Sequence, residues 1–168
     1  MFDIYGEIPV GIDLGTTNSC IGYWNGSEVK IVPNRMGENL TPSVLYLHND
    51  EFIIGEHIQR DLNLLNNSIK LYSLKRIIGQ DFNDIGLEEE IKNLHYNIVK
   101  GKDNQPLIKL IINKEEKLFT PEELCSLILK KLVEDVEKIV SSKIIKVVIS
   151  VPAYLMMHKE VQLLKQLS

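Results

Sequence analysis

The stretch GIDLGTTNSC, residues 11–20, brings together several features that a phosphate group needs. A tight turn between two strands exposes N–H groups to one side, and glycine lets the backbone approach an anion closely. The hydroxyls of Thr16 and Thr17 add hydrogen-bond donors. Asp13 cannot bind phosphate directly because like charges repel, but it can hold Mg²⁺ or the water around that ion. Residues 13–17 therefore predict a magnesium–phosphate site.

A second interpretation of this turn is local. Asp13 and Thr16 can also make ordinary side-chain turns, and short Asp-x-Gly-Thr turns are common. The turn is not a Walker A loop, because it lacks the GxxxxGK[ST] spacing and the helix that follows that motif. The motif alone leaves the phosphate site and the structural turn both open.

Short strands must hold the turn in place. Apolar runs bounded by turn residues predict strands on both sides of it, and the pair Asn25-Gly26 tolerates positive φ and predicts a hairpin. A second hairpin is expected around the turn HNDE, and a third, with one further strand, nearer the C-terminus. The predicted strands are 9–14, 20–24, 28–32, 44–47, 52–55, 96–100, 106–112 and 116–119.

Helical spacing of apolar residues predicts helices at 56–65 and 69–78, and a short acidic one within 83–94. The clearest helix begins at Thr120, with Pro121 at the first helical position and Glu123 completing a capping box. Its apolar residues recur every four positions from Leu124 to Val140 and predict one buried stripe. The β-branched run 144–152 then predicts a strand buried on both faces, followed by a last helix.

Composition excludes several classes of protein. The chain has 168 residues, is 44% hydrophobic and 25% charged, and carries a net charge of −4, which suits one globular domain or lobe. It has no basic block for nucleic acid, no apolar run for a membrane span and no secretory or transit signal at its N-terminus. We therefore expect a cytoplasmic protein with two reduced cysteines, Cys20 and Cys125, and no zinc site.

The opening motif resembles the first phosphate loop of the heat-shock-protein-70 chaperones, which share a superfamily with actin and the sugar kinases. Sugar kinases share the D-x-G-T-[TS] piece, but further motifs in family-like order and spacing separate the two groups. These are TPS at 41–43, IG at 54–55, LKRIIG at 74–79, F-x-PEE at 119–123 and VVISVPAY at 147–154.

The resemblance implies roles for individual residues. Gly15, Thr16, Thr17 and Asn18 would contact the β- and γ-phosphates of ATP or ADP, and Asp13 would hold magnesium through water. Lys75 matches the family's catalytic lysine, which neutralises charge near the γ-phosphate and helps to place the attacking water. Without the resemblance, Lys75 would be read as part of a solvated helix face.

The resemblance also implies a fold. We expect an α/β structure of the ribonuclease-H-like, actin-like ATPase kind, in which helices flank a mixed β-sheet and an α+β subdomain is inserted. The core subdomain would comprise about 9–41 and 119–168, and the inserted subdomain about 42–118. Together, residues 1–168 would form a truncated first lobe of a nucleotide-binding domain.

An intact protein of this family would couple ATP hydrolysis to the binding and release of unfolded polypeptides, with J-domain co-chaperones and nucleotide exchange factors as partners. This chain alone is expected to bind ATP weakly and not to turn it over. Pro152 matches a proline that relays nucleotide state between domains, but Glu160 stands where the family has an arginine, which puts that relay in doubt. The alternative is a non-catalytic remnant or interaction module.

Overall fold

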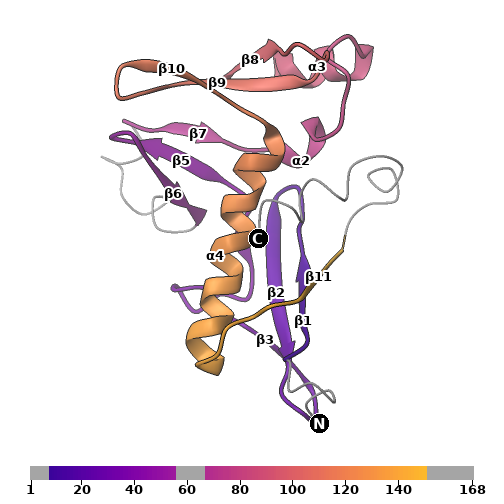
Figure 1. The fold of residues 1–168 in the computed structure, drawn as a ribbon, viewed down its shortest axis with the longest axis vertical. Coiled ribbons are helices and arrows are strands. Elements are labelled where there is room, and N and C mark those ends of the chain that lie inside the picture. The colour runs from indigo at the N-terminus through magenta and orange to yellow at the C-terminus, as the bar shows by residue number, and fades with distance from the viewer. Residues whose placement is uncertain (1–7, 56–66, 151–168) are drawn as a thin grey trace.

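The computed structural model describes residues 8–55 and 67–150, and these form three β-sheets and a long helix. One sheet has five strands, in the order β11-β1-β2-β3 with β4 paired to β2. The other two have three strands each, in the orders β6-β5-β7 and β10-β9-β8. In Figure 1 the five-stranded sheet forms the lower part of the molecule, and the two smaller sheets form the upper part.

The five-stranded sheet carries the turn that contains Gly15, Thr16 and Thr17. Its central strands β1 (Val10–Asp13) and β2 (Asn18–Trp24) are antiparallel neighbours, as the sequence predicted. Beyond them lie β3 (Val29–Ile31), β4 (Thr41–Pro42) and β11 (Val147–Ser150). β11 runs parallel to β1, so the sheet is mixed.

The prediction that β11 is buried on both faces was wrong. Its residues alternate between half-buried and exposed, and Val148 is 76% exposed. Val147 and Ile149 pack against the hydrophobic core, while Val148 and Ser150 point to the opposite face of the sheet. A β-branched run shows strand propensity, but it does not show how many faces of the sheet are covered.

The two smaller sheets contain the predicted hairpins and, in addition, one strand at residues 69–71 that was predicted as helix. One contains β5 (Leu45–His48), β6 (Glu51–Ile54) and β7 (Ile69–Leu71), and the other contains β8 (Asn97–Lys100), β9 (Pro106–Ile112) and β10 (Glu115–Phe119). The predicted acidic helix is α3 (Ile85–Lys92). Both sheets come from the part of the chain assigned to an inserted subdomain; the boundaries 42–118 stay a prediction.

The predicted helix at 69–78 was wrong over its first half. Residues 69–71 form β7 against β5, and only α2 (Leu74–Ile77) is helical. Ser73, between the two, has a left-handed backbone with φ 56°, which a continuous helix does not allow. Apolar spacing over so short a run fits a strand as well as a helix, and pairing with β5 decides the outcome. The helix predicted at 56–65 lies outside the described residues, as does the last helix.

Helix α4 (Pro121–Val140) holds the sheets together. The Thr120 hydroxyl accepts from the N–H of Glu123, and the Glu123 carboxylate accepts from the N–H of Thr120, so the predicted capping box is confirmed. Its buried stripe includes Leu124, Ile128 and Leu132 and packs into the main core. Figure 1 shows α4 running from the upper sheets down along the five-stranded sheet.

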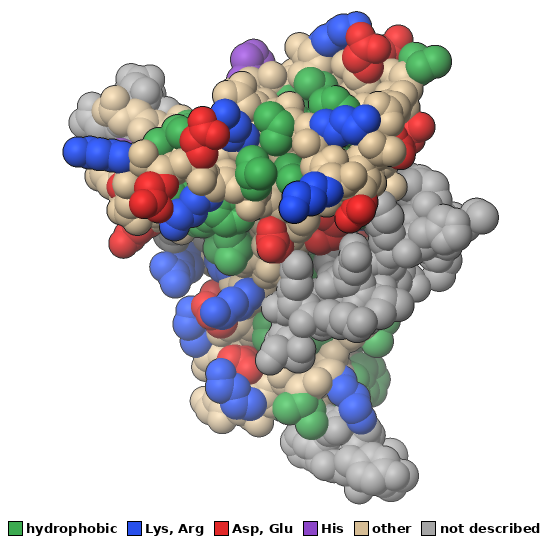
Figure 2. All heavy atoms as spheres, turned by 45° about the horizontal axis from the view of Figure 1, so that its top comes forward, with side chains coloured by type: hydrophobic (Ala, Val, Ile, Leu, Met, Phe, Trp, Pro, Cys, Tyr) green, Lys and Arg blue, Asp and Glu red, His purple; other side chains and the backbone are tan. Residues whose placement is uncertain are grey.

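Charges of both signs mix on the surface. On the face in Figure 2, Lys and Arg side chains alternate with Asp and Glu over the upper sheets, with no area of one sign. Within the described residues, no helix is long and apolar enough to cross a membrane.

Candidate functional site

The turn between β1 and β2 is very tight. Leu14 is only 2% exposed and anchors its start in the core. A Cβ added to Gly15 would lie 2.0 Å from the backbone oxygen of Asn18, far inside van der Waals contact. Only glycine therefore fits at this position without moving the backbone.

Two N–H groups of the turn have no acceptor among the described residues. The N–H of Gly15 donates to Ser19 Oγ at 3.3 Å, and the carbonyl of Thr17 accepts from the N–H of Ser43 at 2.8 Å. The N–H groups of Thr16 and Thr17 donate to neither a backbone nor a side-chain atom in that part of the chain. Thr16 is half-buried and Thr17 is exposed, so a solute can reach both. Adjacent unpaired N–H groups in a turn form an anion-binding concavity.

Asp13 closes β1 directly before the turn. It pairs with Cys20 on β2 and with Ser150 on β11, and its side chain is exposed. The Ser150 hydroxyl donates to Asp13 Oδ1 at 2.5 Å, which fixes one side of the carboxylate. In the described part of the chain, no group of three or more His, Cys, Asp and Glu residues could hold a metal ion. Water or a bound molecule can supply further ligands to a metal at Asp13.

Lys75 reaches the turn from α2, 61 residues along the chain. Its ammonium donates to the carbonyl of Leu14, and the residue is only 7% exposed. Leu74 and Ile77 are buried on either side of it, and α2 packs against α4, so the helix is fixed in place. Burial lowers the pKa of Lys75, while the nearby charge of Asp13 opposes that shift.

Most of the chain is similar in sequence to known proteins. A family model described as Hsp70 protein matches residues 9–161. The chain belongs to the Hsp70 family. It is 41% identical over 145 residues to the chaperone protein DnaK of Thermus thermophilus, in each of two strains. It is 35% identical over 146 residues to heat shock cognate 70 kDa protein 3 of Dictyostelium discoideum.

These Hsp70 relatives are much longer than this chain. The matches cover 86% of the chain but only 22% of DnaK and 23% of the Dictyostelium protein. The chain thus spans less than a quarter of the curated relatives it matches.

The sequence-predicted residues of this Hsp70 chain do meet in space. Asp13, Gly15, Thr16, Thr17 and Asn18 occupy one end of the β1–β2 hairpin, and Lys75 contacts that end through Leu14. Their roles toward a nucleotide stay predictions. Pro152 and Glu160 lie outside the described residues.

Sequence reasoning missed three serines at this site. Ser19 and Ser43 are buried beneath the turn, and Ser150 binds the Asp13 carboxylate. Ser43 was noticed only as part of the TPS motif. One signal was available, since Ser19 is a polar residue directly before the predicted apolar strand 20–24.

Proposed function

We propose that this chain is the ATP-binding first lobe of a heat-shock-protein-70-type chaperone, and that its β1–β2 turn holds the β- and γ-phosphates. The main support is the pair of N–H groups at Thr16 and Thr17, which lack an acceptor in the described residues and lie next to a buried lysine. Their threonine hydroxyls and the side chain of Asn18 supply further donors.

Gly15 contributes by letting the turn close tightly, since a Cβ there would lie 2.0 Å from the backbone oxygen of Asn18. The N–H of Gly15 already donates to Ser19 Oγ. This residue therefore contributes van der Waals contact to the phosphate rather than a hydrogen bond. Lys75 contributes charge. A lysine ammonium has three N–H donors, and the bond to Leu14 leaves two for a γ-phosphate or for an attacking water.

Asp13 suits magnesium bound through water. Mg²⁺ commonly takes one or two protein carboxylates and completes its shell with water and substrate phosphates, and Asp13 is an exposed carboxylate beside the turn. Bound there, the ion would neutralise charge on the phosphates. Ser150 holds one carboxylate oxygen and leaves the other open to such water.

The activity of the longer protein follows from the family. We propose that a full-length relative of this chain uses ATP hydrolysis to bind and release unfolded polypeptides, with J-domain co-chaperones and nucleotide exchange factors, in the cytoplasm. This chain by itself binds ATP weakly and does not turn it over, because a single turn and a lysine supply part of the contacts that phosphoryl transfer needs.

The test is a ³¹P NMR titration of the 168-residue chain with ATP, ADP and AMP, with and without Mg²⁺. We expect ATP and ADP to bind with magnesium dependence, AMP to bind less, and no phosphate to be released. Asp13→Asn should remove the magnesium dependence, whereas Lys130→Met, an exposed charge on α4, should change nothing. Absence of ATP and ADP binding at millimolar protein would overturn the proposal and favour an interaction module.

A further inference from the structure

Beneath the β1–β2 turn lies a pair of buried hydroxyls that the proposed function does not use. Ser19 is 1% exposed and Ser43 is 5% exposed, and their Oγ atoms lie 2.8 Å apart. Ser19 is the second residue of β2, and Ser43 follows β4 on the way to β5. Buried hydroxyls in an apolar core are costly unless they are paired, and these two pair with each other.

The two serines are bonded to the turn at two points, Ser19 through its hydroxyl and Ser43 through its backbone N–H. Ser19 Oγ accepts the N–H of Gly15 at 3.3 Å, and the N–H of Ser43 donates to the carbonyl of Thr17 at 2.8 Å. One anchor therefore lies before Thr16 and the other on the carbonyl side of Thr17. The peptide units between the anchors carry the N–H groups that lack an acceptor in the described residues.

We infer that Ser19 and Ser43 are positioning residues for the phosphate-binding turn. Their hydroxyl pair fixes the backbone so that the N–H groups of Thr16 and Thr17 face the anion before it binds. The pair also joins the turn to the segment that enters the β5–β7 sheet, so a displacement of that segment alters the turn. This inference rests on the proposed function for its ligand, but the backbone arrangement it describes does not need a ligand.

The arrangement has a physical advantage for binding. An anion site whose N–H groups are already aligned loses less conformational entropy when the ligand arrives. Without the hydroxyl pair, Gly15 would lose its acceptor, and glycine is the residue with the widest choice of backbone conformations. The turn would then sample shapes in which Thr16 and Thr17 diverge.

The test compares Ser19→Ala, Ser43→Ala and the double variant in the 168-residue chain. Thr41→Val is the matched control, because Thr41 is buried at 3% exposure on β4 and its hydroxyl makes no hydrogen bond within the described residues. The first readout is amide hydrogen exchange at Gly15 without ligand. The second is the dissociation constant for magnesium tripolyphosphate, a probe that lacks the base and ribose.

Each serine variant should weaken tripolyphosphate binding about fivefold, the equivalent of one hydrogen bond. Each should also speed exchange at Gly15. The double variant should lose little more than either single variant, because both changes break one connected network. Thr41→Val should keep or raise thermal stability, because an unpaired buried hydroxyl is costly, and it should keep both readouts. Should Ser43→Ala fail to fold, Ser43→Cys fills the site with a slightly larger group that is a weaker donor, and this variant is measured in its place.

Two results separate the possible failures. If the serine variants lose only stability and keep both readouts, the positioning role is wrong even though the chain binds phosphate. If the unaltered chain does not bind tripolyphosphate, the proposed function is wrong, and exchange at Gly15 alone then decides whether the serines order the turn.

Discussion

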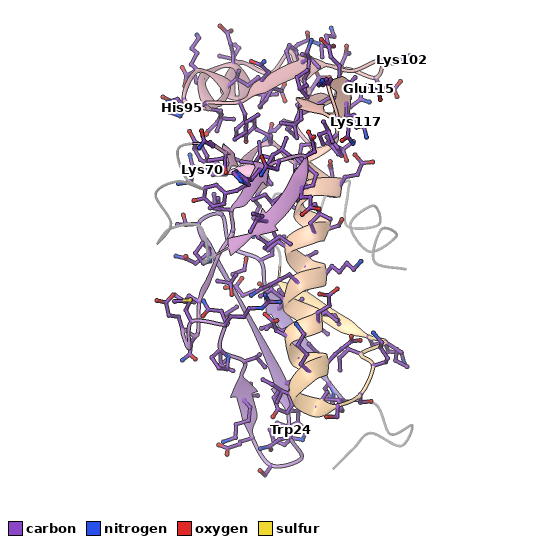
Figure 3. The ribbon with its side chains drawn as sticks, turned by 90° about the vertical axis from the view of Figure 1, so that its left-hand side faces the viewer. Trp24, Lys70, His95, Lys102, Glu115 and Lys117 are labelled. Carbon is purple, nitrogen blue, oxygen red and sulfur yellow. The ribbon has the colours of Figure 1, made fainter. Side chains whose placement is uncertain are left out.

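Two turns at opposite ends of β2 differ in how their backbone N–H groups are hydrogen-bonded. The Gly15 turn lies at the inner end, next to α2, and the Asn25 turn lies at the outer end beyond Trp24. Figure 3 shows Trp24 at the foot of the molecule, far from the upper sheets. Both turns contain a glycine and polar residues, so composition does not distinguish them.

Their hydrogen bonds do distinguish them. At the outer turn, Asn25 Oδ1 accepts from the N–H of Ser27 at 2.9 Å and from the N–H of Glu28 at 3.0 Å. The inner turn leaves the N–H groups of Thr16 and Thr17 without an acceptor in the described residues. A turn that satisfies its own donors has little to offer an anion, whereas a turn held from below by buried serines keeps its donors for one.

The largest expected effect comes from placing a Cβ in each turn. Gly15→Ala puts a methyl group 2.0 Å from the Asn18 carbonyl oxygen, so the backbone must move and phosphate binding should fall at least about thirtyfold, or ~2 kcal/mol. Gly26→Ala strains a residue with φ 102° and should cost roughly 1–3 kcal/mol of stability while phosphate binding is kept. Titration calorimetry with magnesium tripolyphosphate and thermal melts measure the two quantities.

Lys75→Met should separate binding from stability. Loss of the ammonium should weaken tripolyphosphate binding about tenfold, by roughly 1.4 kcal/mol, whereas Lys130→Met should not. Stability should be kept or raised, because a buried charge is costly.

The pH dependence of stability gives a second test of Lys75. Its folded pKa lies below the unfolded value of about 10.5, so the cost of burying the charge is present at neutral pH. As pH rises through the folded pKa, the folded lysine loses its proton first and this cost disappears. Melts between neutral pH and pH 10 should therefore show the unaltered chain gaining stability relative to Lys75→Met. A constant difference would contradict the assignment of a buried, charged lysine.

Asn25→Ala should have a smaller effect, confined to stability. It removes the acceptor shared by Ser27 and Glu28 and should cost about 1 kcal/mol. Tripolyphosphate binding should not change, because the inner turn is at the other end of the strand. A change in binding would show that the two ends of β2 are coupled.

The smallest expected effect concerns the two free thiols. Cys20 lies on β2 opposite Asp13 and is half-buried, whereas Cys125 is buried in α4, where burial raises its pKa to about 12. At pH 8 a thiol reagent should modify Cys20 and leave Cys125 intact until the chain is unfolded. Bound tripolyphosphate should slow the reaction of Cys20, which mass spectrometry can follow. Modification of Cys125 in the native chain would contradict the packing of α4.

The sequence predicted most of the strands and the long helix because their signals are local. Asn25-Gly26 specifies a turn and Thr120 with Glu123 specifies a helix start without help from distant residues. The strand at residues 69–71 could not be predicted in this way. Its short apolar spacing fits a helix as well as a strand, and pairing with the distant strand β5 decides between them.

The candidate site likewise contains residues that local sequence predicts and residues that only the fold brings together. The turn residues could be found from types and spacing, and Lys75 from the family resemblance. Ser19 and Ser43 are 24 positions apart in the sequence, and Ser150 and Asp13 are 137 positions apart. A local sequence pattern does not predict contacts between such distant residues.

Of the two turns of β2, we propose that only the Gly15 turn binds phosphate. A ¹H–¹⁵N NMR titration of the 168-residue chain with magnesium tripolyphosphate tests it at single residues. We predict that the amide signals of Thr16 and Thr17 shift with one saturating dependence, while those of Ser27 and Glu28 stay in place. Unchanged Thr16 and Thr17 signals, or equal shifts at both turns, would contradict the account.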